Sequence, residues 1–327
     1  MRPVAGTEIL LILMTLIWGA NFSVIKASLS DFLPLTFNIL RFLIASVLIL
    51  AILRHREGSL RTDKATLWKT AILGFIGNTI YQLLFIQGIK WTRAGDATLI
   101  LALLPMTILL LGAALGMERF RFGNALATGI SFSGVLVAVY SSSQRSTAHA
   151  SNPILGNLLI LVCVVCWAAY SLFSAPLMKH MSPLRFSALT MAFGTLFLLP
   201  MSLPQLLSQD WKSVSAAAWG GLFFSSFLAL VFCYIVWYNG VRRLGNNRAS
   251  IYSNLSAPFG ILIAWLILGE DLSLWHLLGT VMVLFGIYLN RTIGAGRVQK
   301  HADREAALPL PALSRRVVDE IPSQPEA

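Results

Sequence analysis

Ten apolar runs, each long enough to cross a lipid bilayer as a helix, dominate this chain of 327 residues. A helix needs about 20 apolar residues to span a hydrocarbon core of about 30 Å. Lipid leaves backbone groups no partner outside the chain, and the runs lack the short alternation of a membrane β-barrel. The sequence therefore predicts an all-α integral membrane protein with ten transmembrane helices. In chain order, the runs are 8–27, 34–53, 69–90, 95–117, 122–141, 154–175, 184–204, 214–239, 248–269 and 273–292.

The distribution of basic residues predicts how the chain lies in the membrane. Only 12% of the residues are charged, yet the net charge is +11. If the N-terminus is cytoplasmic, nineteen of the 25 basic residues fall on the cytoplasmic side and five on the other, while Arg41 lies inside a run. This positive-inside pattern predicts two cytoplasmic termini. It also explains the basicity through contact with anionic lipid, so no nucleic-acid partner is expected.

The two halves of the chain resemble each other. A shift of 149 residues aligns Trp18 with Trp167, and a shift of 153 aligns Pro105 with Pro258. Each half holds five runs, so an odd number of crossings inverts the second copy relative to the first. Inverted repeats around a central cavity are typical of secondary transporters, which open that cavity to each side in turn.

The repeat divides the chain into three expected regions. The first five-helix repeat covers residues 1–145 and the second, inverted repeat covers 146–294. Residues 295–327 are charged, contain prolines and lack periodicity, so we expect a disordered cytoplasmic tail.

Several motifs resemble the EamA family of the drug/metabolite transporter superfamily. They include "LIWGANFSVIKASLSDFLPLTFNILRFLIASVLIL" near the start and "GILIAWLILGEDLSLWHLLGTVMVLFGIYLN" near the end. The resemblance covers residues 8–292. It implies a bacterial inner-membrane carrier of small metabolites, commonly amino acids or related compounds. Helices one to four and six to nine are then expected to surround the cavity, with the fifth and tenth at the periphery.

Polar and aromatic side chains at helical spacing are the candidate substrate-binding residues. Trp18, Phe22 and Lys26 recur every four residues, with Asn21 beside them. This stripe is interpreted either as cavity lining or as an interfacial aromatic belt with ordinary packing. The further candidates are Arg41, Asn78, Tyr81, Gln82, Trp167, Tyr170, Tyr234, Trp237 and Tyr238.

Arg41 and two prolines have more specific expectations. A charge at the middle of a membrane helix costs about 2.5–3.5 kcal/mol unless polar groups surround it. Arg41 therefore either attracts a substrate carboxylate or makes structural hydrogen bonds, and the sequence leaves both open. Pro105 and Pro258 lie mid-run at equivalent positions, where each is expected to kink its helix and mark a helix-break or gating position.

The sequence favours a secondary active transporter that exports a small metabolite by alternating access. A sugar-phosphate or nucleotide-sugar carrier of the same superfamily remains an alternative, although it would need more basic groups. An integral-membrane enzyme is disfavoured because the five histidines are never paired at ligand spacing. No metal or cofactor is expected, and no phosphate-binding loop indicates direct use of ATP. The expected partners are a small-molecule substrate and the lipid bilayer; a coupling proton and the choice between monomer and homodimer are left open.

Overall fold

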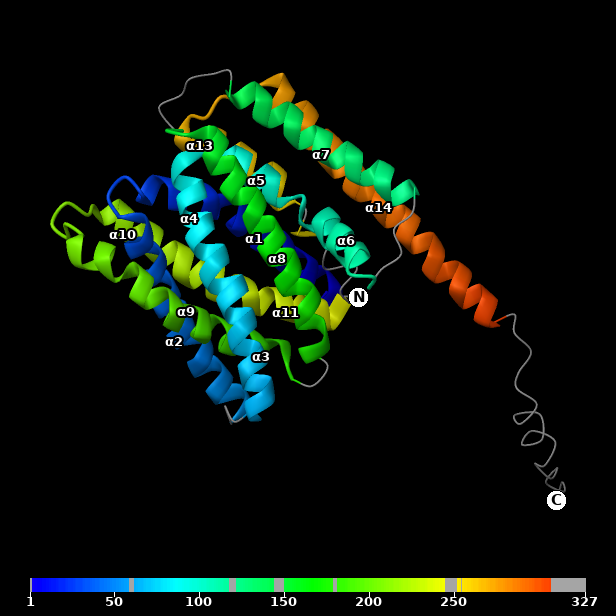
Figure 1. Ribbon diagram of the computed structural model, residues 1–327, viewed down its shortest axis with the longest axis horizontal. Coiled ribbons are helices and arrows are strands. Elements are labelled where there is room, and N and C mark those ends of the chain that lie inside the picture. The colour runs from blue at the N-terminus through cyan, green and yellow to red at the C-terminus, as the bar shows by residue number, and fades with distance from the viewer. Residues whose placement is uncertain are drawn as a thin grey trace.

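The computed structural model describes residues 2–58, 62–117, 122–143, 150–178, 181–244, 252–253 and 255–306, and all regular structure in those ranges is helical. This confirms the predicted all-α class. Figure 1 shows the helices gathered into one bundle from which the C-terminal helix projects. The elements are α1 (Arg2–Ser28), α2 (Pro34–Glu57), α3 (Lys64–Gly74), η1 (Phe75–Ile80), α4 (Tyr81–Trp91), α5 (Ala94–Leu101), α6 (Leu104–Ala114), α7 (Phe122–Ser143), α8 (Pro153–Leu177), α9 (Pro183–Ser208), α10 (Ala216–Phe223), η2 (Phe224–Phe232), α11 (Cys233–Leu244), α13 (Ser256–Leu268) and α14 (Leu274–Ala306).

The described part of each of the ten expected spans is largely helical. Seven helical segments among the described residues are long and apolar enough to cross a membrane, and α5 with α6 forms an eighth span that bends by 41°. The last two spans correspond to shorter apolar helices, Ser256–Leu268 and Leu274–Asn290. Large apolar side chains such as Leu136, Leu158 and Val281 are exposed on the outside of the bundle. An outer surface of this kind suits lipid as the solvent.

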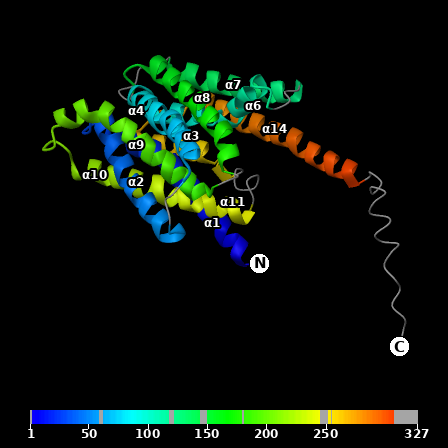
Figure 2. The same cartoon turned by 60° about the horizontal axis from the view of Figure 1, so that its bottom comes forward.

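The helix contacts are arranged with the symmetry expected of a repeat. The α1–α13 contact of one half corresponds to α8 packing on α5 and α6 in the other. The α4–α8 contact corresponds to α11–α1, and η1–α9 corresponds to η2–α2. Equivalent helices also contact each other: α2 with α9, α5 with α13, and α7 with α14. The α2–α9 and α7–α14 pairs lie at opposite sides of the bundle (Figures 1 and 2). An approximate two-fold axis therefore passes through the contacts of these pairs.

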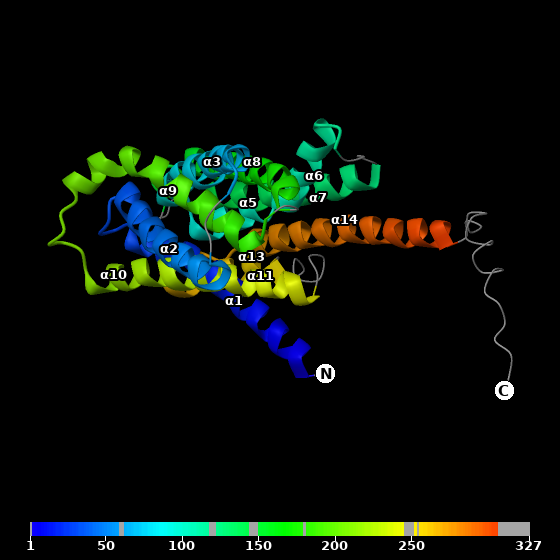
Figure 3. The same cartoon turned by 90° about the horizontal axis from the view of Figure 1, so that it is seen from below.

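Equivalent residues meet on that axis. Ser46 and Thr195 differ by the 149-residue repeat shift, and their hydroxyl oxygens lie 2.7 Å apart in a hydrogen bond between α2 and α9. At the other pair, α7 and α14 approach closely through glycines: a Cβ atom on Gly134 of α7 would lie 2.6 Å from the carbonyl oxygen of Gly279, and one on Gly286 of α14 would lie 2.5 Å from that of Ala127. Glycine at these positions allows the two helices to run side by side at the periphery, as expected (Figure 3).

Two π-helical segments occur at equivalent places that the sequence did not reveal. Both η1 and η2 interrupt a membrane span, and their first residues, Phe75 and Phe224, are separated by the repeat shift. π-helical turns inside α-helices frequently mark functional sites because they change the direction of side chains and free backbone carbonyls. Here η2 contributes Ala229 and Leu230 to the wall of the central cavity, and η1 directly precedes the lining residues Tyr81 and Gln82.

The mid-helix kink expected at the two prolines is wrong in detail. The chain breaks before Pro105, at Ala102 and Leu103, so that Pro105 lies in the first turn of α6. Pro258 likewise lies in the first turn of α13. A first-turn residue has no hydrogen-bond partner for its backbone nitrogen inside the helix, so proline begins these helices without loss. The break itself is real, because α5 and α6 bend by 41° there.

The last helix also continues further than expected. α14 extends to Ala306, well into the region that we expected to be disordered from residue 295. Residues 307–327 lie outside the described structure.

Candidate functional site

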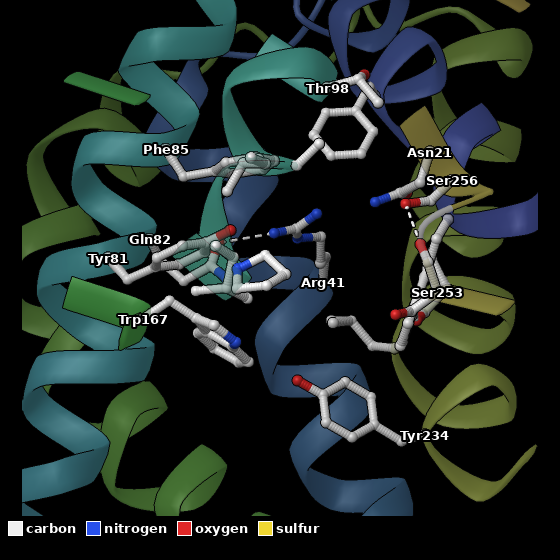
Figure 4. Close-up of a pocket in the computed structure, with 18 residues that line it drawn as sticks. Asn21, Arg41, Tyr81, Gln82, Phe85, Thr98, Trp167, Tyr234, Ser253 and Ser256 are labelled. Atoms are coloured by element: carbon white, nitrogen blue, oxygen red, sulfur yellow. Dashed lines mark hydrogen bonds between the residues drawn. The ribbon is translucent and has the colours of Figure 1, made fainter. Parts of the chain in front are cut away.

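A central cavity of about 280 Å³ lies between the two halves of the bundle (Figure 4). Its wall comes from α1, α2, α4, α5, α6 and α8, from η2 and α11, and from the chain leading into α13. The lining residues are Trp18, Asn21, Phe22, Arg41, Tyr81, Gln82, Phe85, Thr98, Leu101, Ala102, Leu104, Pro105, Trp167, Ala229, Leu230, Tyr234, Ser253 and Ser256.

Nine sequence-predicted site residues meet at this cavity. They are Trp18, Asn21, Phe22, Arg41, Tyr81, Gln82, Pro105, Trp167 and Tyr234. Helical periodicity identified the inward face of α1 correctly, because Trp18, Asn21 and Phe22 all face the cavity. The expectation that helices six to nine all line it is too broad, since α9 contributes no residue to the described wall.

Aromatic rings give the cavity rigid walls. Tyr81 stacks on Phe85 with ring centroids 5.6 Å apart, and Trp167 lies 5.2 Å from Tyr81. On the opposite side, Trp18 donates its indole N–H to the carbonyl oxygen of Ala229 in η2 at 3.0 Å. The π-helical segment of the second repeat thus fixes an aromatic wall that belongs to the first.

Arg41 provides the only charged side chain among the described lining residues. It is 2% exposed, and its guanidinium donates to the side-chain oxygen of Gln82 at 2.7 Å and to the hydroxyl of Ser225 at 3.0 Å. Its Nε has no hydrogen-bond partner, and no carboxylate in the described structure lies within ion-pair distance. A buried charge that lacks a counter-ion is unfavourable.

Asn21 provides an acceptor in the same space. Its side-chain oxygen is buried and has no hydrogen-bond partner within the described residues. Figure 4 places Arg41 between the side formed by Tyr81, Gln82 and Trp167 and the side formed by Asn21 and the serines that precede Pro258. The cavity therefore offers one cationic donor and one neutral acceptor across a gap lined by aromatic rings.

Two predicted residues lie away from the cavity because they hold helix ends and crossings. Lys26 donates from Nζ to the carbonyl oxygens of Ile89 at 2.8 Å, of Lys90 at 3.1 Å and of Thr92. These carbonyls end α4, where a cation complements the helix dipole. Asn78 in η1 packs against Gly194 of α9, where α9 approaches closely.

Tyr170 and Trp237 are also outside the described wall. Tyr170 lies beneath η1 against Gly77, and its hydroxyl is 3.1 Å from that of Thr190. Thr190 is the repeat equivalent of Arg41, so at the position where the first repeat has a buried arginine the second has Thr190 packed against Tyr170. Trp237 supports Trp18 from behind at a centroid distance of 6.2 Å. Tyr238 lies in α11, outside the residues whose side chains the structure describes.

Several lining residues were missed. Phe85 lies one helical turn after Tyr81 on α4, so the same helical spacing that indicated Tyr81 could also have indicated Phe85. Ser253 and Ser256 precede Pro258, and Ser256 donates to the carbonyl oxygen of Ser253 at 2.8 Å. Polar residues next to a helix break could have been predicted to line the cavity, because non-helical backbone within a membrane is tolerated where it lines a cavity.

The family model for EamA-like transporters matches residues 6–140 and 154–292, one match in each half. The chain belongs to the EamA-like transporter family. Its membership agrees with the repeat, the multi-pass membrane fold and the central cavity. EamA-like proteins are transporters, so this chain is a membrane transporter of metabolites.

Similar proteins of this family come from several bacteria. An uncharacterized transporter of Bacillus subtilis, YyaM, is 27% identical over 91% of this chain and 96% of its own length. A probable terminal-alkyne amino-acid exporter of Streptantibioticus cattleyicolor is 27% identical over 88% of this chain and 94% of its own length. A probable amino-acid metabolite efflux pump of Salmonella typhimurium is 26% identical over 86% and 93%, respectively.

Proposed function

We propose that this protein exports a small metabolite with a carboxylate group, an amino acid or a related compound, by alternating access across the bacterial inner membrane. The observation that carries the proposal is Arg41, a buried cation in the cavity wall with an unpartnered Nε and no counter-ion among the described residues. A substrate carboxylate would supply the missing charge and accept hydrogen bonds from the guanidinium.

Other residues of the wall, on both sides of Arg41, suit the ammonium group of a zwitterion. The free side-chain oxygen of Asn21 can accept from an ammonium, and the faces of Trp18, Tyr81 and Trp167 attract cations. Binding both charges of an amino acid in this way adds no fixed negative charge to the site. Aromatic rings then leave room for an apolar side chain.

The size and charge of the cavity favour this substrate class over phosphorylated ones. Small-molecule pockets typically occupy roughly 300–1,000 Å³, and this cavity of about 280 Å³ is close to the lower end. A sugar-phosphate or nucleotide-sugar would bring two or more negative charges, whereas the described wall holds one cation. The names of the Streptantibioticus and Salmonella relatives support an amino-acid-like substrate and an outward direction.

The inverted repeats support alternating access. Because equivalent contacts exist in both halves, exchanging the conformations of the repeats would close one end of the cavity and open the other. The positive-inside charge distribution supports two cytoplasmic termini and hence the direction of each helix.

Counterflow in proteoliposomes tests the proposal. Vesicles loaded with one unlabelled amino acid at a time should accumulate the same radiolabelled amino acid when the purified protein is present. Protein-free vesicles serve as the control. The corresponding amino-acid amides, which lack the carboxylate, should exchange much more slowly. If no carboxylate-bearing solute exchanges under any imposed gradient, the proposal is wrong.

A further inference from the structure

A second polar cluster joins the two repeats at one end of the cavity. Glu270, in the connection between α13 and α14, accepts hydrogen bonds from the backbone nitrogens of Ala94 at 2.7 Å and Gly95 at 3.0 Å. These nitrogens open α5, and a carboxylate at a helix N-terminus is stabilised by the helix dipole. The connection in the second repeat is therefore tied to the fourth span of the first repeat.

A buried carboxylate and imidazole lie at the same junction. His276 is 5% exposed, and its Nε2 lies 3.0 Å from Oδ1 of Asp96, which is fully buried. The other ring nitrogen, Nδ1, lies 3.0 Å from the hydroxyl of Ser273. This hydroxyl can donate to a neutral ring or accept from a protonated one, so the same contacts suit both protonation states.

The cluster lies just beyond the cavity at this end. On α5, Asp96 precedes the lining residue Thr98 by two positions. On α1, Lys26 follows the lining residue Phe22 by one helical turn and binds the end of α4. The network thus occupies the layer immediately beyond the cavity, and a substrate leaving through this end has to part it.

Charged side chains of both signs meet in this layer. Among the described residues, the inner cations are Lys26 on α1 and Arg93 immediately before α5, and the buried carboxylates are Asp96 and Glu270. Lys90 and Asp271 add one exposed charge of each sign. Of the other helices packed on α5, α7, α8 and α13 carry no acidic, basic or histidine residue in their described ranges. A proton on His276 would place a further cation directly beside the buried carboxylate of Asp96.

Water can reach the pair from outside. A crevice of about 10 Å³, lined in part by Arg93, Glu270, Asp271 and His276, lies beside it, and a space of about this size holds one water molecule. The side chain of Asp271 is 56% exposed, so the crevice lies next to solvent. Arg93 makes no hydrogen bond from its buried guanidinium and lies 3.7 Å from Asp271. A buried cation without hydrogen-bond partners is unfavourable, so this arrangement of Arg93 favours a rearrangement that would give it partners.

We propose that Asp96 and His276 form a proton-binding site, and that the bound proton stabilises the closed form of this end of the cavity. Imidazole is the side chain that exchanges protons near neutral pH. Protonation gives His276 a charge-assisted hydrogen bond to Asp96, whereas its loss leaves this buried carboxylate with a neutral donor from the ring. The closed form therefore gains stability as pH falls. This gating role rests on the alternating access proposed above.

Cysteine labelling from one face of the membrane tests the site. The reporter is Leu101→Cys, which lines the cavity, in a background with Cys163, Cys166 and Cys233 replaced by serine. A membrane-impermeant thiol reagent is applied in proteoliposomes to the face that carries Ser213. The exposed loop of Ser213 contacts the chain that follows α1, and so lies at the same end as the cluster. Ser213→Cys corrects for the pH dependence of the thiol itself.

We expect labelling of the reporter, relative to Ser213→Cys, to be at least about fivefold faster at about pH 8 than at about pH 5.5. His276→Gln and Asp96→Asn should each reduce this ratio to below about twofold, because either change removes the titrating pair. Thr280→Ala should retain the ratio of the parent. Thr280 is buried one turn further along α14 and bonds only to the carbonyl oxygen of His276, so its loss perturbs the helix without changing the pair.

The outcomes separate this inference from the proposed transport function. If the parent labels equally at both pH values, or if both pair variants keep the pH dependence of the parent, the proton site is wrong. Counterflow in the same vesicles reports transport independently. Exchange of amino acids with pH-independent labelling would overturn only the proton site, and pH-dependent labelling without any exchange would overturn only the transport proposal.

Discussion

Two buried regions of the molecule treat positive charge differently. At the closed end, Lys26 is held by three carbonyl oxygens of the α4 terminus, and Arg93 and His276 face carboxylates. In the cavity, Arg41 has two neutral partners and no carboxylate within the described structure. The first arrangement surrounds its cations with carbonyl oxygens and carboxylates, whereas the second leaves its cation without a carboxylate among the described residues. A cation in a membrane helix is thus interpreted from its partners rather than from its depth alone.

The largest expected effect comes from Arg41→Gln. Removing one partner of a buried charge pair costs about 2–5 kcal/mol, so carboxylate transport should fall by at least about 100-fold. The amount of protein in the membrane should change by less than about twofold, because glutamine retains neutral hydrogen bonding. Initial rates of counterflow and quantitative blotting measure the two quantities. Ser225→Ala, which keeps the charge, is the matched control and should lose less than about tenfold. Equal losses of transport and abundance in Arg41→Gln would make Arg41 structural.

Lys26→Met should affect stability instead of solute choice. Hydrogen bonds to a charged group contribute about 1.5–3 kcal/mol, and their loss leaves the end of α4 uncapped. We expect the unfolding free energy in detergent to fall by about 2–3 kcal/mol. Preference for amino acids over their amides should remain. Lys90 lies in the last turn of α4, next to the carbonyl oxygens that Lys26 binds, but its side chain is exposed, so Lys90→Met should change neither stability nor solute preference. A lost preference without destabilisation would place Lys26 in substrate binding.

Gly134→Val tests whether the peripheral pair matters only for assembly. The added Cβ would lie 2.6 Å from the carbonyl oxygen of Gly279 and 2.8 Å from the Cβ of Met282, so α7 and α14 must separate. Overpacking of this kind typically costs about 1–3 kcal/mol. Thermal unfolding should show the loss, while solute preference persists. Gly129→Val on the same helix has open space around it and provides the control.

The smallest effect is expected at Asp31, outside the membrane-spanning helices. Hydrogen bonds from the side chain and backbone of Ser215 and from the side chain of Ser30 lower the pKa of the Asp31 carboxyl. Because this pKa is lower in the folded protein than in the unfolded chain, the ionised carboxylate stabilises the fold at any pH above the unfolded-state pKa. That stabilisation is lost as the pH falls through the folded-state pKa. Asp31→Asn should slightly lower the melting temperature at neutral pH. The difference from the parent should vanish as pH falls below about 4. A difference that grows in acid would contradict this assignment.

The sequence predicted the helices and much of the cavity because both depend on local patterns. Apolar length located the spans, the repeat shift related the halves, and helical spacing placed Trp18, Asn21 and Phe22 on one inward face. A charge inside a span identified Arg41. Each of these patterns can be recognised from residues that are close together in the chain, or from one constant shift that aligns the two halves.

The features that the sequence did not predict depend on contacts between helices that are far apart in the chain. Lys26 continues the inward stripe of α1, but its role follows from the end of α4, which no spacing in α1 reveals. Thr190 takes the place of Arg41 in the second repeat, so Tyr170 turns away to pack there. Asp96 and His276 are 180 residues apart and join α5 of the first repeat to α14 of the second. The π-helical segments have no evident motif, and only the structure locates them.

Equilibrium binding of an amino acid and its amide to the purified protein and to Arg41→Gln tests the central claim most directly. Both ligands carry the ammonium group and the same side chain, so they differ only in the group that Arg41 is proposed to bind. The parent should bind the acid about 10- to 100-fold more tightly, as a charge-assisted hydrogen bond implies, and the variant should bind the two within about threefold. An acid preference of the same size in Arg41→Gln would contradict the account.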